Sequence, residues 1–353
     1  MGLGNSLQTA QAAAGGGAGV GGWVELARTT LGGTADLIDV TSFTDKRYYM
    51  ILSDLGRSGA IGIRNRVGTT SIDTGSNYAR RLSDNGASDS TAVNGTFVDL
   101  AFMDDEASDI FQVAYASNLS GKEKLFNVQT VGGQATGSGS APNRGEGVFK
   151  WANTSAPMQS WRSYHASSGD YTSGSEVVVL GWDPADTHTS NFWEELASVD
   201  LSGGAANLID SGTFTAKKYL WIQLYVSTTG GAVSQRLTFN SDTGTNYAQR
   251  KSFDGGSDTT SVNSSNIDGM NDDLVTNSGG FTNMFIINNS ANEKLGIGHT
   301  ISQEAAGAGT APTRDEEVFK WVNTSSQITR LTFTNNKAGD MDTTTTLKVW
   351  GSD

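Results

Sequence analysis

The sequence contains two copies of one long segment, and this duplication restricts the fold more than any other feature. Trp23 and Trp193, 170 residues apart, each open a Trp-x-Glu-Leu-Ala segment. Residues 141–155 (APNRGEGVFKWANTS) match residues 311–325 (APTRDEEVFKWVNTS) at eleven of fifteen positions. Solenoid repeats span only about 20 to 50 residues, so each copy here should fold as a self-contained domain.

The repeats divide the chain into four predicted parts. We expect an N-terminal arm at 1–21, a first repeat at 22–182, a linker at 183–190 and a second repeat at 191–353. The linker reads DPADTHTS. Its proline cannot donate a backbone hydrogen bond, and Asp, Thr and Ser favour turns over regular structure.

Strand patterns dominate both repeats. In 217–226 (KKYLWIQLYV), Leu220, Ile222, Leu224 and Val226 alternate with larger, more polar residues, as in a strand with one face in the core. The Gly- and Asp-rich segment 254–258 is typical of the turns between strands. We therefore predict an all-β chain of two tandem, homologous β-sandwich or jelly-roll-like domains after a short arm. Further predicted strands, all short, are Arg47–Leu52, Ser234–Phe239, Met284–Asn288, Val318–Val322, Val177–Gly181 and Thr345–Trp350.

Composition excludes several classes of function. The chain has 24 basic and 37 acidic residues, a formal charge of -13, which disfavours binding to nucleic acid or anionic lipid. No cysteine is present, so disulfides and thiolate metal sites are excluded. No apolar run approaches the roughly 18 residues of a membrane helix, and Met1–Gly22 lacks the pattern of a secretory signal. An extracellular role would then need another route, such as release by lysis.

No catalytic motif occurs in the sequence. The three histidines, His165, His188 and His299, are not in a metal-ligand spacing or beside a nucleophile motif. We expect a protein that is not an enzyme and has no cofactor. A polysaccharide-degrading enzyme stays an alternative, because the two opposed carboxylates of a glycosidase would be visible only in the fold.

Two equivalent loops carry oxygen-rich side chains. Asp73 and Asn77 in the first repeat correspond to Asp242 and Asn246 in the second, each pair followed by a tyrosine. Loops of this kind can bind Ca²⁺. They can also be turns in which Asp and Asn bond to nearby backbone above a packed tyrosine.

An aromatic face accompanies the predicted core strand of the second repeat. Tyr219, Trp221 and Tyr225 alternate with the core residues and could stack on the apolar faces of sugar rings. The alternative is packing against the second sheet or against a neighbouring subunit.

The arm contains one predicted helix, Ser6–Ala14. Nine residues are marginal as an isolated helix, so a partner would have to stabilise it. Leu7, Ala10 and Ala14 are the side chains we expect to anchor it to that partner.

Four segments in the repeats and linker resemble uncharacterised structural proteins of marine tailed phages, cyanophages among them. The resemblance implies a virion surface component, such as a head fibre, a decoration protein or a tail-associated fibre. It supplies no catalytic residues. The segments are 21–26 (GGWVEL), 181–186 (GWDPAD), 215–221 (TAKKYLW) and 288–295 (NNSANEKL).

The sequence therefore predicts a phage virion accessory protein that projects its β-sandwich domains for host-surface or glycan contact. One alternative is a capsid decoration or cement protein, and others are the polysaccharide-degrading enzyme and a free lectin. The expected partners are capsid or tail subunits, further copies of the chain and a host glycan, without nucleic acid or membrane insertion. We expect a closed rotational homo-oligomer, with a trimer first, on the virion surface and extracellular after host lysis.

Overall fold

The computed structural model describes residues 19–20, 22–59, 62–101, 109–165, 169–184, 186–188, 191–303 and 307–353. Throughout these ranges every regular element is a strand, so the predicted all-β class is confirmed. In the same part of the chain, no helix is long and apolar enough to span a bilayer. Leu7, Ala10 and Ala14, with the predicted helix Ser6–Ala14, lie outside the described residues.

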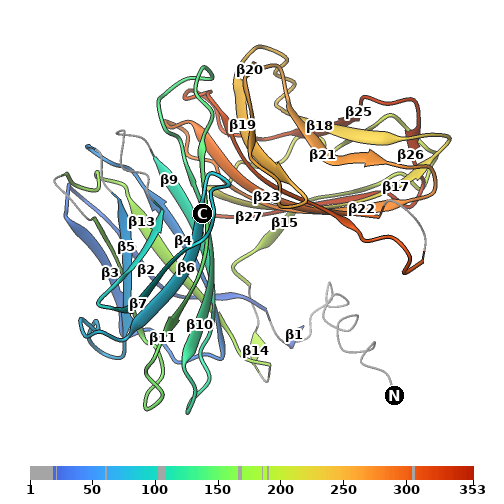
Figure 1. The fold of residues 1–353 in the computed structure, drawn as a ribbon. Coiled ribbons are helices and arrows are strands. Elements are labelled where there is room, and N and C mark those ends of the chain that lie inside the picture. The colour runs from blue at the N-terminus through green and yellow to red at the C-terminus, as the bar shows by residue number, and fades with distance from the viewer. Residues whose placement is uncertain are drawn as a thin grey trace.

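The first repeat is a sandwich of two antiparallel sheets (Figure 1). Its large sheet has eight strands and its small sheet four. The large sheet is, in sheet order, β2 (Val24–Thr30), β13 (Glu176–Trp182), β4 (Tyr48–Leu55), β9 (Ile110–Ser117), β10 (Lys124–Gly132), β11 (Asn143–Trp151), β6 (Tyr78–Asp84) and β7 (Ser90–Gly95). The small sheet is β3 (Leu37–Thr41), β12 (Ser160–His165), β5 (Ile63–Gly68) and β8 (Val98–Ala101).

The second repeat has the same strand order as the first. The order itself was not part of the sequence prediction. Its large sheet is β15 (Glu194–Asp200), β27 (Thr346–Ser352), β17 (Tyr219–Thr229), β22 (Gly279–Ile287), β23 (Lys294–Ser302), β24 (Thr313–Trp321), β19 (Tyr247–Phe253) and β20 (Thr259–Ser264), with β26 (Asp340–Met341) beside the end of β17. Its small sheet is β16 (Leu208–Asp210), β25 (Leu331–Asn335), β18 (Val233–Phe239) and β21 (Ile267–Leu274).

Each sandwich encloses its own apolar core. In the second repeat, Leu220, Ile222, Leu224 and Val226 are all fully buried there, so the predicted core face of this strand is confirmed. Asp254 and Gly255, in a predicted turn cluster, have φ values of 49° and 71°, and positive values of this kind suit Asp and Gly.

Some predicted strands are shorter than the observed ones. β22 and β24 have nine residues each and β17 has eleven. The predicted strands end where the alternation of apolar residues ends. The observed strands continue through buried polar residues such as Glu317 and Thr282. Backbone pairing with neighbouring strands stabilises these extensions.

The segment predicted as a linker includes a short strand. β14 (Thr187–His188) pairs with β1 (Gly19–Val20), which the sequence had assigned to the arm. The residues before β14 do form a turn, in which the Asp186 amide donates to the Asp183 carbonyl at 3.0 Å. Lys46 forms an ion pair with Asp186 at 2.6 Å, so this connection is fixed to the first repeat.

The two sandwiches pack against each other through the outer faces of their large sheets. Figure 1 shows the strands of one large sheet running steeply across those of the other. A third apolar cluster lies between the repeats, separate from the two cores. This arrangement covers part of each outer face and leaves the rest exposed.

Candidate docking surface

The covered part of the outer faces is an apolar interface. Phe111 and Val131 of the first repeat are buried in the same cluster as Leu295 and Val318 of the second. Tyr219 is only 1% exposed, and its hydroxyl donates to Glu176 Oε1 of the first repeat at 2.8 Å. The burial of these side chains stabilises the contact between the repeats.

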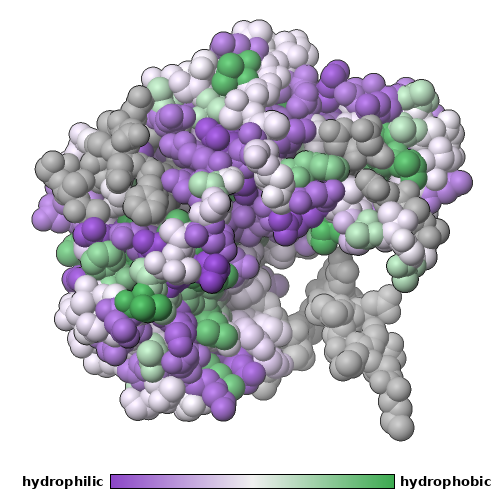
Figure 2. Space-filling view, in the orientation of Figure 1, coloured by the Kyte–Doolittle hydropathy of each residue, from purple (hydrophilic) through white to green (hydrophobic). Residues whose placement is uncertain are grey.

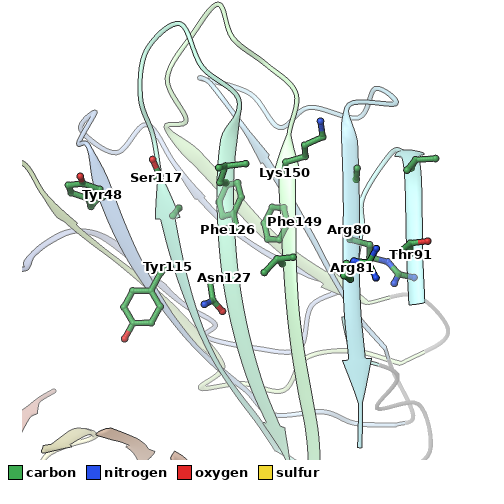
Figure 3. A pocket seen from close by; sticks show the side chains of 15 residues that line it. Tyr48, Arg80, Arg81, Thr91, Tyr115, Ser117, Phe126, Asn127, Phe149 and Lys150 are labelled. Atoms are coloured by element: carbon green, nitrogen blue, oxygen red, sulfur yellow. The ribbon is translucent and has the colours of Figure 1, made fainter. Parts of the chain in front are cut away.

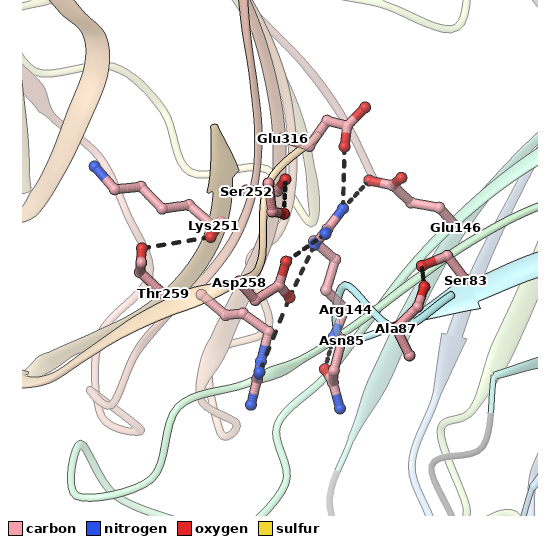
Figure 4. Close-up of polar contacts among 12 residues, drawn as sticks. Ser83, Asn85, Ala87, Arg144, Glu146, Lys251, Ser252, Asp258, Thr259 and Glu316 are labelled. Atoms are coloured by element: carbon pink, nitrogen blue, oxygen red, sulfur yellow. Dashed lines mark hydrogen bonds and ion pairs between the residues drawn. The ribbon is translucent and has the colours of Figure 1, made fainter. Parts of the chain in front are cut away.

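A buried arginine borders this apolar interface (Figure 4). Arg144 of β11 donates to Asp258 Oδ1 at 2.5 Å and to Glu316 Oε2 at 3.3 Å, both in the second repeat. It also bonds to Glu146 of its own strand. Burial and the nearby Glu146 charge raise the pKa of Glu316 above its ordinary value. Arg144 offsets the charge of the three carboxylates around it.

One exposed part lies on the first repeat, and we call it the open face. It is the outer side of β7, β10 and β11, where Val93, Leu125 and Val148 are 72%, 57% and 50% exposed. These side chains belong to a shallow groove of about 760 Å³ (Figure 3). Figure 2 shows hydrophobic side chains over the lower part of this repeat, where Figure 1 places these strands. Exposed apolar side chains gathered in one groove make it a candidate site of interaction.

The chemistry of the open face suits a protein partner. Its most exposed apolar side chains are aliphatic. Polar side chains lie beside them, because Lys150 pairs across strands with Leu125, and Arg81 and Asn127 pair with Val148. Arg81 pairs with Asp89 at 3.2 Å and Lys150 pairs with Glu123 at 2.9 Å, both on the surface. None of the described residues that line the groove is acidic. The groove therefore does not offer the two carboxylates of a glycosidase.

An aromatic corner adjoins the open face. Trp23, Tyr48, Tyr115, Trp182 and Pro184 line a pocket of about 290 Å³, and Tyr48 and Tyr115 line both sites. The rings of Tyr48 and Trp182 stack with centroids 5.6 Å apart. The buried indole Nε1 of Trp182 has no hydrogen-bond partner among the described residues. The corner therefore offers aromatic surface, with this donor enclosed beneath it.

The predicted glycan-contact residues are not in this corner. Tyr219 and Trp221 lie in the interface between the repeats, so the prediction of a glycan contact is wrong for Tyr219, which is buried. Trp221 stacks on Phe285 with centroids 5.6 Å apart. Tyr225 is 44% exposed and remains available for contact. The sequence missed the actual partner of this aromatic face, which is the other repeat.

The predicted calcium loop of the second repeat has the geometry of a hydrogen-bonded turn. Asp242 accepts from the Gly244 amide at 2.8 Å, from Asn246 at 2.9 Å and from Trp321 Nε1 at 2.7 Å. The Tyr247 hydroxyl donates to the Asp242 carbonyl at 2.9 Å. Burial opposes ionisation of Asp242, but these hydrogen bonds outweigh it and hold its pKa below its ordinary value.

The first repeat has the same turn. Asp73 accepts from Gly75, Asn77 and Trp151 at 2.7, 2.8 and 2.7 Å, and the Tyr78 hydroxyl donates to its carbonyl. Both carboxylates therefore already accept several donors. This is the turn that the sequence offered as the alternative to Ca²⁺ binding, and calcium stays a prediction without support from the geometry.

Among the residues that the structure describes, one further group of side chains could hold a metal ion. Ligand atoms of Asp36, His165 and Asp170 lie within 4.8 Å of one another at the surface of the first repeat. Hydrogen bonds with Asp170 and His165 lower the pKa of Asp36, which is exposed. The three residues already interact with one another, and we assign them no ion.

The enzyme alternative would require a site that brings carboxylates together. Asp109 and Glu293 line a pocket of about 250 Å³ between the repeats, and burial raises the pKa of Asp109 to about 6. Glu293 is already engaged there, because Oε1 accepts from the Gly137 amide at 2.5 Å and Oε2 pairs with Lys320 at 3.5 Å. This carboxylate fixes the packing of the repeats.

Comparison with known proteins gives no family. No family model matches the chain, and no curated protein matches it. Among solved structures, the LG1-3 region of the laminin alpha2 chain matches with a TM-score of 0.20 and 8% sequence identity. The match covers 89% of this chain and 64% of that structure. Domains LG4-5 of the mouse laminin alpha1 chain match with a TM-score of 0.17 and 8% sequence identity, over 93% of this chain and 89% of that structure. Overlaps this low carry no argument about function.

Proposed function

We propose that the chain is a structural accessory protein of a bacteriophage virion, and that it works by contact with other proteins and without catalysis. The observation that supports this most is the open face, where Val93, Leu125 and Val148 leave an aliphatic surface on a folded domain. Soluble proteins seldom expose a contiguous apolar surface unless a partner covers it. On the particle, this face is the docking surface for a neighbouring protein.

The sequence supports a location on a phage virion. Four segments resemble structural proteins of tailed phages, and neither a catalytic motif nor a basic surface suggests another class. The role is that of a fibre-like protein of the head or tail, or of a decoration protein that stabilises the shell. In both roles the chain is held by its apolar face and presents the remaining surface to solvent.

Glycan contact is the second candidate, and the aromatic corner favours it. Tyr48 and Trp182 give an aromatic surface of the kind on which the apolar face of a sugar ring stacks. Tyr48→Ala should then abolish binding on a glycan array, and Tyr225→Ala, at the originally predicted surface, should not. Equal binding by both variants and the unmodified chain would remove this candidate.

The main proposal is tested on particles. Particles assembled with the unmodified chain or with Leu125→Asp are compared by cryo-electron microscopy for occupancy by this protein. The control is Leu208→Asp, because Leu208 is 48% exposed on the small sheet of the second repeat, on the other side of that sandwich. We expect Leu125→Asp to lower the occupancy and Leu208→Asp to leave it unchanged. Full occupancy by Leu125→Asp would contradict docking through the open face.

A further inference from the structure

The contact between the two repeats is only partly symmetric. Some equivalent residues meet in it, such as Gln129 with His299 and Tyr115 with Phe285, but other parts of it are not equivalent. The first repeat contributes Phe111 and Val131, which are cross-strand partners on β9 and β10. The second contributes Leu295 and Val318, at the other end of its sheet on β23 and β24. At these positions the contact is heterologous, because residues that are buried in one repeat have exposed equivalents in the other.

The region by which the second repeat docks has an exposed copy in the first. Leu295 and Val318 are each 1% exposed, whereas their equivalents Leu125 and Val148 are 57% and 50% exposed. The register is the same, since Leu295 faces Lys320 across β23 and β24 as Leu125 faces Lys150 across β10 and β11. The open face thus carries exposed copies of two residues by which the second repeat docks within this chain.

The lysines of this surface follow the same pattern. Lys320 is fully buried, and its Nζ donates to the carbonyl oxygens of Gly133 and Ala135 in the first repeat at 3.0 and 2.5 Å. Lys150 instead pairs on the surface with Glu123 at 2.9 Å. A partner on the open face would supply the environment that Lys320 has within the chain.

The complementary region also has an exposed copy, in the second repeat. Phe281 and Ile301 are the equivalents of Phe111 and Val131, and they are 40% and 57% exposed. Tyr225, 44% exposed, pairs across strands with Phe281, which pairs with Ile301. We call Tyr225, Phe281 and Ile301 the distal row. It crosses β17, β22 and β23 as one contiguous apolar strip.

We propose that the distal row of one copy of this chain docks on the open face of another copy, in the manner in which the first repeat contacts the second. The inference rests on the proposed function of the open face as a docking surface, and it names the partner. Leu125 and Val148 would face Phe281 and Ile301 without burying any unpaired charge. Tyr225 is the equivalent of Asp54 in the first repeat. At that position the contact between copies is therefore more apolar than the contact between the repeats. Repetition of one heterologous contact builds a ring if the rotation closes and a filament if it does not.

Two substitutions test this head-to-tail contact. Leu125→Asp blocks the open face and Ile301→Asp blocks the distal row, and sedimentation velocity of each purified full chain reports its mass. The unmodified chain should associate into species of at least twice the mass of one chain, and each variant alone should remain monomeric. A mixture of the two should form dimers and nothing larger, because each variant retains one intact and complementary surface. Leu208→Asp should associate like the unmodified chain.

Three results would overturn the inference. The first is a monomeric unmodified chain at all concentrations. The second is association by Ile301→Asp equal to that of the unmodified chain, which would indicate a symmetric contact between two open faces. The third is a mixture that stays monomeric. If the chain is monomeric while Leu125→Asp still lowers its occupancy on particles, the proposed function stands and the partner is another protein.

Discussion

Leu125 and Leu295 provide a matched test of the arrangement of the repeats, because they are the same residue at equivalent positions in two environments. Leu295 is 1% exposed in the cluster between the repeats, whereas Leu125 is 57% exposed. Truncation of a buried leucine to alanine costs about 2 to 5 kcal/mol from lost burial and the resulting cavity. Truncation at an exposed position usually changes stability by less than about 0.5 kcal/mol. We expect Leu295→Ala to destabilise strongly and Leu125→Ala hardly at all.

Urea unfolding followed by tryptophan fluorescence measures both effects. The chain should be dilute, so that association between copies does not contribute to the stability of either variant. Since the repeats can unfold separately, each transition is fitted by itself. Equal losses in the two variants, or a larger loss for Leu125→Ala, would refute the packing of the second repeat against the first.

Three further predictions concern buried polar groups. Burial raises the pKa of Glu317 from 4.5 to about 8. Between these pH values the folded chain therefore keeps a proton that the unfolded chain loses. The unfolding free energy should fall by about 5 kcal/mol as the pH rises from 4.5 to 8, at ~1.4 kcal/mol per pH unit. Glu317→Gln should remove most of that pH dependence in denaturant titrations at several pH values, and an unchanged slope would be inconsistent with a buried acid. Asp242→Ala should lower the unfolding free energy by about 1 to 3 kcal/mol, because it leaves the Trp321 donor unpaired. Added calcium should not change the melting temperature of the unmodified chain. A calcium-dependent rise would restore the metal-binding interpretation. Tyr219→Phe should destabilise the chain by about 1 kcal/mol through loss of the bond to Glu176, and an unchanged unfolding midpoint would argue against that bond.

The fold class was predictable because its physical signal is local. Alternation at Leu220, Ile222 and Leu224 fixes which side of β17 faces the core, and the Gly- and Asp-rich clusters fix the turns. The strand order was not predictable, since it depends on pairings between distant segments. The ends of β24 were missed because a buried carboxylic acid such as Glu317 is indistinguishable in sequence from an exposed one.

The candidate site was harder to predict than the fold. Leu125 and Leu295 occupy the same sequence context, Glu-Lys-Leu, so no sequence pattern separates the exposed residue from the buried one. The difference arises only from how the repeats pack. For the same reason the sequence offered sugars, the second sheet or a neighbouring subunit as the partner of Tyr219, although this residue meets the first repeat.

Solvent accessibility at the two equivalent leucines is the most direct test of the account. Carbene footprinting with mass spectrometry can label Leu125 and Leu295 in the dilute chain and again in the assembled particle. We expect Leu295 to be protected in both samples, and Leu125 to be labelled in the dilute chain and protected in the particle. Labelling of Leu125 that is unchanged on assembly would contradict the claim that the open face of the first repeat is a docking surface.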